Sequence, residues 1–302
     1  MRSMLTLAAT LVFAAFTNSA HAALNILATV PEWAALAEEI GGDKVKVSAA
    51  TQALQDPHRV EARPSLIARA RNADLVIATG AELEIGWLPL VLQQSANPKV
   101  QPGQPGYFEA TSAVTMLGKP ARLDRSEGDV HPFGDPHIQT DPRNIARVAT
   151  PLAERMAALD APNAAFYRDR LKRFLERWNA AIAKWEGQAA ALKGVPVIVQ
   201  HRSFTYLIAW LGLKEVAALE PKPGMEPTTA HLSSVLETLK REPAKMVLRA
   251  AYQGDRASQW ISERAKVPVV TLPFTVGGDD SAKDLFSLFD DTILRLVKGN
   301  AA

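Results

Sequence analysis

Five histidines are the side chains of this sequence best suited to bind a metal ion. They are spread through the chain after residue 22, at His58, His131, His137, His201 and His231. Neutral imidazole is the commonest zinc ligand and also binds other transition metals. The 302 residues contain no cysteine, which excludes disulfide bonds and thiolate ligands. A transition-metal site in this chain is therefore expected to consist of histidine, with or without a carboxylate.

Two of the histidines stand in the same short motif. Asp-Pro-His occurs at residues 56–58 and again at 135–137. Proline fixes its own φ and holds the preceding residue extended, so each histidine follows a stiff segment with a preset direction. His201 is expected at the carboxyl end of a buried strand, where its side chain would point into the space between two lobes. We predict that folding brings His58, His137 and His201 together as a metal site.

Other polar residues leave alternatives open. His131 is either a fourth ligand, a transient collector of metal, or an ordinary loop residue. His231 falls in a predicted helix and is expected to be solvated or to cap that helix. Glu61, three residues after His58, either accepts the far ring N–H of that histidine or is a solvated loop charge. Glu226 is expected to fix a loop rather than to bind metal.

The elements that must position these histidines alternate between strand and helix. From 24 to 94 and again from 195 to 297, short apolar runs are followed by amphipathic segments that end at glycine or proline. This order is typical of parallel sheets covered by helices. Residues 97–141 lack such a pattern and are rich in proline and glycine, which indicates a connection that is either functional or disordered.

One long helix is predicted between the two alternating regions. From Asn163 to Lys193, apolar residues recur every three or four positions with charged residues between them. Pro162 suits a first helical turn, and Gly194 suits the residue that closes a helix. Such a helix is about 45 Å long, which is more than one small domain needs. We therefore expect a rigid helix that spans two lobes, rather than a surface helix on a single domain.

The sequence thus predicts an α/β protein with two lobes, each with a parallel sheet flanked by helices, joined by one long rigid helix. The expected boundaries are a signal peptide at 1–22, an N-terminal lobe at 23–161, the linking helix at 162–194 and a C-terminal lobe at 195–302. In open α/β sheets, ligands bind beyond the carboxyl ends of the strands. A cleft between the lobes is therefore the expected binding site.

Composition narrows the compartment and the partners. The charges of the 34 basic and 32 acidic residues nearly cancel. The chain therefore has no large positive electrostatic potential that would attract nucleic acid or an anionic membrane. Arg2, the apolar run 4–16 and the small-x-small pattern at 20–22 indicate a secretory signal peptide that is removed. Without cysteine, no N-terminal lipid anchor is expected. We therefore expect a soluble, monomeric protein in a bacterial periplasm.

Four motifs follow one another along the mature chain. They are Asp-Pro-His with Arg-Pro-Ser at 56–65, Gly-Asp-Pro-His with Asp-Pro at 134–142, His-Arg-Ser-Phe-Thr-Tyr-Leu at 201–207, and Glu-Pro-Lys-Pro-Gly-Met-Glu-Pro at 220–227. In order and spacing they resemble the zinc- and manganese-binding proteins of bacterial ABC importers, the cluster A-I solute-binding proteins. The resemblance implies two α/β lobes linked by a long helix, no enzymatic activity, and delivery of a divalent metal to an inner-membrane ABC permease.

In that family the motif histidines are the ligands, which implies His58 and His137 from the first lobe and His201 from the second. Many members add an aspartate directly after the last strand, where this chain has no acidic residue at 274–276. Asp280, in the loop just beyond, is the expected replacement. The alternatives for the fourth position are Asp279, Asp284, His131 and water, although Asp284 also suits the acidic first turn of the closing helix.

Three neutral nitrogens and at most one carboxylate suit a four-coordinate Zn²⁺ site. Manganese prefers more oxygen ligands, so zinc is the expected metal and manganese the alternative. A zinc hydrolase is a second hypothesis, with Glu61 and Asp280 as the only candidate general bases, but the chain lacks the His-Glu-x-x-His pattern. A third hypothesis is an adhesin, or a binder of a small organic or metal-chelate ligand, and the missing lipid-anchor cysteine argues against display on a cell surface.

Overall fold

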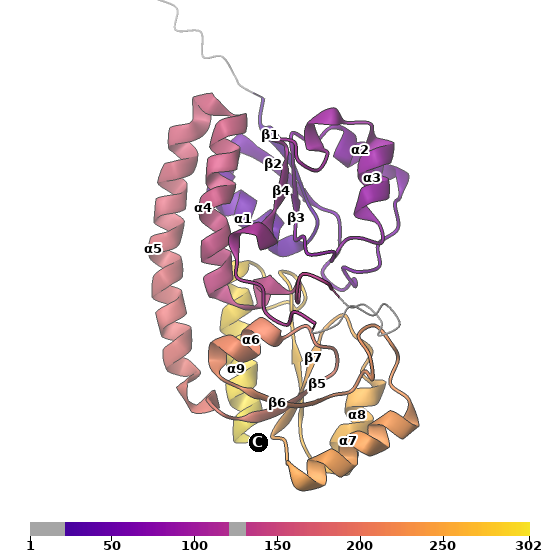
Figure 1. Cartoon of the computed structure of the whole chain (residues 1–302). Coiled ribbons are helices and arrows are strands. Elements are labelled where there is room, and N and C mark those ends of the chain that lie inside the picture. The colour runs from indigo at the N-terminus through magenta and orange to yellow at the C-terminus, as the bar shows by residue number, and fades with distance from the viewer. Residues whose placement is uncertain (1–21, 121–130) are drawn as a thin grey trace, which may run out of the picture.

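Two parallel four-stranded sheets form the frame of the molecule (Figure 1). The computed structural model describes residues 22–120 and 131–302. The strand order is β2-β1-β3-β4 in the first sheet and β6-β5-β7-β8 in the second, so the two lobes repeat one topology. The strands are β1 (Leu24–Ala28), β2 (Val45–Ala49), β3 (Leu75–Ala78), β4 (Tyr107–Glu109), β5 (Pro196–Val199), β6 (Lys214–Ala218), β7 (Met246–Ala250) and β8 (Val269–Leu272).

Helices pack on both faces of each sheet because the central strands are apolar on both faces. In β3, Leu75 and Ile77 belong to one hydrophobic core, whereas Val76 and Ala78 belong to another. Alternate side chains of a strand point to opposite faces, so both faces must be covered. The helices are α1 (Pro31–Gly41), α2 (Pro64–Arg71), α3 (Leu88–Ser95), α4 (Pro142–Leu159), α5 (Ala164–Gln188), α6 (Thr205–Leu211), α7 (Thr229–Arg241), α8 (Arg256–Ala265) and α9 (Leu285–Ala301).

The long helix α5 lies beside α4 and runs along both lobes (Figure 1). It ends at Gln188, so the prediction of one uninterrupted helix to Lys193 is wrong at this end. The chain tightens there into a 3-10 turn, Ala190–Leu192, which buries Leu192 before Gly194 adopts a φ of 78°. The buried side follows the predicted three- and four-residue steps and consists of Tyr167, Leu171, Phe174, Trp178, Ile182 and Trp185.

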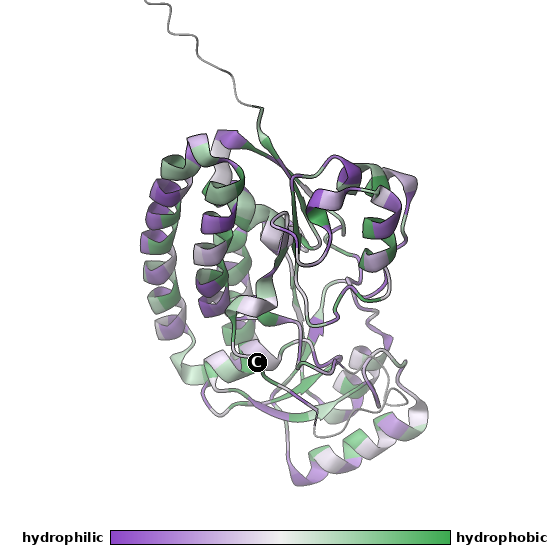
Figure 2. Cartoon of the chain, turned by 45° about the horizontal axis from the view of Figure 1, so that its top comes forward, coloured by the Kyte–Doolittle hydropathy of each residue, from purple (hydrophilic) through white to green (hydrophobic). Residues whose placement is uncertain are grey.

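One hydrophobic core connects the two lobes. It joins residues of β1 and β3 to residues of β5, β7 and β8 through the buried sides of α5 and α9. At its centre, the ring of Trp178 lies 5.1 Å from that of Trp185 and 5.6 Å from that of Phe289, measured between centroids. Two smaller cores lie under α2 and α3 and under α7 and α8. Figure 2 shows hydrophilic and hydrophobic residues alternating along the long helices of the molecule.

The predicted fold class, two α/β lobes with parallel sheets and a long linking helix, is confirmed. The stretch 97–141, for which no element was predicted, contains the edge strand β4, which pairs with β3. The predicted lobe boundaries stay predictions, and the predicted signal peptide lies almost entirely outside the described residues. Within residues 22–120 and 131–302, no helix combines the length and the apolar character that a membrane crossing requires.

Candidate metal site

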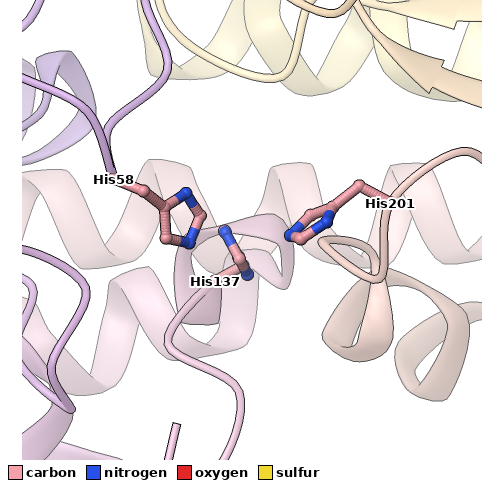
Figure 3. A group of neighbouring side chains, drawn as sticks. All are labelled: His58, His137 and His201. Atoms are coloured by element: carbon pink, nitrogen blue, oxygen red, sulfur yellow. The ribbon is translucent and has the colours of Figure 1, made fainter. Parts of the chain in front are cut away.

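Three histidines from distant parts of the chain lie together where the lobes meet (Figure 3). One ring nitrogen from each of His58, His137 and His201 lies within 4.8 Å of the other two. The ring centroids are 5.1 Å apart for His58 and His137, and 5.6 Å apart for His137 and His201. Small inward movements of the rings would let the three nitrogens bind one ion at about 2.0 Å each.

The two Asp-Pro-His motifs form the same turn. Oδ1 of Asp56 accepts a hydrogen bond from the backbone N–H of His58 at 3.0 Å and also contacts Nδ1 of its ring at 2.8 Å. Asp135 makes the same two contacts with His137, at 2.8 and 2.7 Å. A carboxylate beside Nδ1 favours the tautomer with the proton on that atom, which leaves the lone pair of Nε2 for a metal. Each motif therefore orients its own histidine.

Glu220, from the loop that follows the neighbouring strand, orients His201. His201 lies just past the end of β5, and its Nδ1 is 2.7 Å from Oε2 of Glu220, which lies just past the end of β6. The parallel pairing of β5 with β6 brings these two strand ends side by side. The same carboxylate oxygen accepts the backbone N–H of Gly224 at 2.8 Å, so Glu220 is itself held in place. His201 thus also keeps Nε2 as its metal-binding atom.

Buried ring nitrogens without partners mark the centre of the site. Nε2 of His58, His131 and His137 is buried and has no hydrogen bond among the described residues. Buried polar atoms nearly always have a partner, so three such atoms in one place indicate a missing ligand. His131 belongs to this group by position, because its ring centroid lies 5.5 Å from that of His58. Its Nε2 is not among the three converging ligand atoms, so the ring would have to move inward to act as a fourth nitrogen ligand.

Burial and neighbouring charges set the protonation of these rings. Burial lowers the pKa of His137, and burial together with nearby histidines lowers the pKa of His131 to about 3. Burial also acts to lower the pKa of His201, but the hydrogen bond and the charge of Glu220 outweigh it and raise that pKa. Burial would raise the pKa of Asp56, yet its contacts with His58 lower it to about 2. Neutral rings are the form that binds metal.

The predicted aspartate ligand does not lie in this cluster. Asp280 is exposed and is not part of the group of converging ligand atoms within the described residues. Asp279 forms an ion pair with an arginine of α9 at 2.8 Å, and Asp284 caps the N-terminus of the same helix. The loop after β8 instead places Phe274 beside the site, with its ring centroid 5.9 Å from that of His137. This loop contributes an apolar wall where a carboxylate was expected.

Sequence reasoning missed the three carboxylates that orient the rings. The partner of the first motif histidine is Asp56 and not the exposed Glu61. The sequence contained a signal for Asp56 and Asp135. An aspartate side chain in a turn commonly accepts a hydrogen bond from the backbone N–H two residues later, which in both motifs is the N–H of the histidine. Glu220 had no local signal. The ring of His231 contacts a backbone carbonyl of β6 at 3.0 Å, and this histidine is outside the cluster.

The arrangement suits the binding and release of a metal ion. The three carboxylates contact Nδ1 of the rings, on the side away from the shared Nε2 atoms. They therefore orient ligands and are not placed as a general base beside a metal-bound water. A cluster of neutral imidazoles is the donor set that borderline divalent metals prefer.

Comparisons with known proteins identify relatives of the whole chain. The family model described as ZnuA, zinc-uptake complex component A periplasmic, matches residues 26–299. A crystal structure of ZnuA shares the fold with a TM-score of 0.76 at 24% sequence identity, over 92% of this chain and 99% of that chain.

Curated relatives include binders of two metals. The zinc-binding lipoprotein AdcA of Streptococcus pneumoniae serotype 4 is 24% identical over 80% of this chain, which spans 47% of AdcA. The manganese ABC transporter substrate-binding lipoprotein PsaA of the same serotype is 20% identical over 92% of this chain and 89% of PsaA. The matched family consists of substrate-binding proteins of ABC importers and not of enzymes. The chain belongs to the ZnuA family of periplasmic zinc-uptake components, the metal-binding subunits of ABC importers.

Proposed function

We propose that this protein captures Zn²⁺ with His58, His137 and His201 and delivers it to the permease of an ABC importer. The observation that carries the proposal is the convergence of three ring nitrogens within 4.8 Å of one another. A carboxylate holds each ring at Nδ1, at 2.7 to 2.8 Å. Ligands that are already oriented lose little conformational freedom on binding, which favours high affinity.

His131 is the proposed fourth ligand, in place of Asp280. Its buried Nε2 has no partner among the described residues, and its ring lies beside that of His58. Its pKa is lowered to about 3, mainly by burial, so the ring is neutral near neutral pH. Four nitrogens would complete a tetrahedral site without a water ligand.

The donor set is the reason for proposing zinc over manganese. The family includes relatives named for each metal, so family membership alone does not choose between them. Zn²⁺ is stable with four imidazole nitrogens, whereas Mn²⁺ prefers a larger number of oxygen ligands. With Phe274 at the place where the carboxylate was expected, this cluster offers nitrogen only among its converging atoms.

We also propose that residues 1–22 are removed on export and that the mature chain acts in the periplasm as a monomer without a lipid anchor. The relatives AdcA and PsaA are named lipoproteins. A thioether-linked lipid needs a cysteine, and the sequence has none. All the proposed ligands come from one chain, so the site needs no second subunit. Intact mass spectrometry of the periplasmic protein would reveal retained residues or an attached lipid.

Release of the metal is proposed to proceed through the ligand loops rather than through wide separation of lobes 23–161 and 195–302. The shared core along α5, in the proposed linker 162–194, packs against both lobes and resists such a movement. The connection between β2 and α2 carries His58 and contains no helix or strand, so it can move without separating the two lobes.

Calorimetric titration of the metal-free mature protein, prepared without a histidine tag, tests the proposal. Zn²⁺ should bind more tightly than Mn²⁺. The substitutions His58→Ala, His137→Ala and His201→Ala should each lower zinc affinity by more than about 100-fold, since even an outer partner of a ligand is worth 10–100-fold. Unchanged affinity in all three variants would exclude the site.

Two further variants separate the fourth ligand from the rest. His131→Ala should lower zinc affinity by about tenfold, which is smaller than the other losses because water can replace one ligand. Unchanged affinity in this variant would assign the fourth position to water. His231→Ala is the matched control, because its ring contacts the backbone of β6 and lies outside the cluster.

A further inference from the structure

A second site is suggested by a cavity in the N-terminal lobe, away from the histidine cluster. It has a volume of about 610 Å³ and is lined by α3, by β4 with the residues before and after it, and by the turn that follows β3. Cavities of this size hold one small organic molecule, and the carboxyl ends of parallel strands are where open α/β sheets bind ligands. None of the three clustered histidines lines it.

The wall of this cavity is largely apolar. Leu88 and Leu92 of α3 form its buried side, and Ile85 and Phe133 form its rim. The two rim side chains are 56% and 59% exposed, which is high for residues of this type. Exposed apolar side chains gathered around one opening indicate a binding surface for an apolar group.

Several hydrogen-bond donors of the wall are already bonded within the protein, whereas its carboxylate and hydroxyl oxygens can still accept. The hydroxyls of Tyr107 and Ser112 both donate to Glu109, at 3.2 and 2.6 Å. The amide of Gln101 donates to two backbone carbonyls, at 3.1 and 2.8 Å. No lysine, arginine or histidine occurs among the described residues of the lining, whereas the exposed carboxylate of Glu109 does. The carboxylate of Glu109 at this wall therefore favours a ligand that donates hydrogen bonds.

The turn at the edge of the cavity is held in an unusual conformation. Gly80, Ala81 and Glu82 have φ values of 89°, 51° and 66°, and the last two are not glycine. Non-glycine residues with positive φ are uncommon and cluster at binding sites. The turn stays in place because the buried carboxylate of Glu84 accepts the backbone N–H groups of Thr79 and Gly80. The cavity is therefore built before any ligand arrives.

We propose that this cavity binds a small organic ammonium compound with an apolar body. The apolar body would lie against α3 and the rim, and the ammonium group would donate to Glu109 and to the hydroxyl oxygens beside it. The site is separate from the metal site, so it should bind its ligand with or without zinc.

Three probes of one shape and different charge test the proposal on the full mature protein. Naphthylethylammonium, naphthylethanol and naphthylacetate would be compared by ligand-observed NMR and by thermal shift, with and without zinc. The ammonium compound should bind most tightly and the carboxylate least. Equal binding of the ammonium and carboxylate probes, or no binding of any probe at millimolar concentration, would overturn the proposal.

Two variants with matched controls locate the binding. Glu109→Gln should lower the affinity for the ammonium probe by about two- to fivefold and leave the affinity for the alcohol unchanged, as expected for an exposed ion pair. Ser112→Trp should fill the opening and weaken both probes by at least about tenfold. The controls are Glu237→Gln and Ser233→Trp, which make the same changes on the exposed side of α7. Equal effects from a variant and its control would place the probe elsewhere and reject this cavity.

Discussion

The two lobes supply histidines to one cluster in different ways. In the N-terminal lobe, an aspartate two residues earlier orients His58 and His137 within a single turn. In the C-terminal lobe, His201 depends on Glu220, 19 residues away along the chain. The first half of the site is therefore built by local sequence, and the second half by the pairing of β5 with β6.

The halves also differ in their electrostatics. The pKa of His131 and of His137 is lowered, chiefly by burial, whereas the pKa of His201 is raised because Glu220 outweighs the effect of burial. His131 and His137 are therefore ready for metal over a wide pH range, whereas His201 holds a proton more readily. The following variants test this difference.

The largest expected effect concerns the contact between the lobes. Glu32 of α1 is 1% exposed and lines the same small cavity as Thr275 of the C-terminal lobe. Burial raises the pKa of Glu32 from 4.5 to about 7, so the folded state becomes less stable as pH rises between these values. Glu32→Gln should remove this loss and stabilise the metal-free protein by about 3 kcal/mol at about pH 8.

Urea unfolding near pH 5 and about pH 8 would measure this effect in both proteins. The stability of the variant should change less between the two conditions than that of the parent protein. Glu176→Gln, on the exposed side of α5, is the control and should leave the pH dependence as it is. The prediction is contradicted if the parent protein and Glu32→Gln show the same change in unfolding free energy between pH 5 and pH 8.

The next largest effect is a loss of zinc affinity when a carboxylate that orients a ring is replaced. Asp135→Asn in the N-terminal lobe and Glu220→Gln in the C-terminal lobe should each lower zinc affinity by about 10–100-fold, because the ring loses its charged partner. Competition with a chromophoric zinc chelator would measure both. Glu226→Gln, an exposed change near Glu220, is the control. If only one of the two variants lost affinity, the two halves of the site would not be equivalent in strength.

The pH dependence of zinc affinity distinguishes the halves directly. The pKa of His201 is raised above its ordinary value of 6.5, so this ring carries a proton at a higher pH than His131 or His137. Zinc must displace that proton, and affinity should fall by up to about tenfold per pH unit below the pKa. In Glu220→Gln the fall should begin at a lower pH. An unchanged profile would show that protons compete elsewhere.

The smallest expected effect is at the mouth of the site. The side chain of Arg59, next to His58, donates to the backbone carbonyl of Gly224 across the lobes at 3.2 Å. Arg59→Gln should raise the rate of zinc release by about two- to tenfold, the equivalent of one ordinary hydrogen bond. Stopped-flow release into a chelator would measure it, with Arg63→Gln as the exposed control. A slower release would mean that this contact holds the loops apart.

The sequence was sufficient for much of the site. The repeated Asp-Pro-His motif and the strand-end position of His201 led to three residues that the structure brings together. The partner Glu220 could not be found, because its contact exists only through the pairing of two strands. Asp280 lies outside the converging group for a related reason, since a position a few residues past a strand does not reveal where the loop turns, and in this chain Phe274 lies beside His137.

The fold was predictable where the pattern was periodic. Both sheets and α5 follow from apolar runs and from three- and four-residue steps. The edge strand Tyr107–Glu109 has only three residues and lies among prolines and glycines, so no period could show it. The end of α5 at Gln188 was missed because Leu192 continues the apolar spacing while the backbone has already changed to a tighter turn.

The continuous core along α5 has a consequence for how the molecule loses its structure. A cut between the lobes would expose the aromatic seam formed by Trp178, Trp185 and Phe289 to water. Neither half should therefore survive as a soluble fragment, although each contains a complete sheet. On heating, the two sheets should melt together in one cooperative transition, as in a single-domain protein.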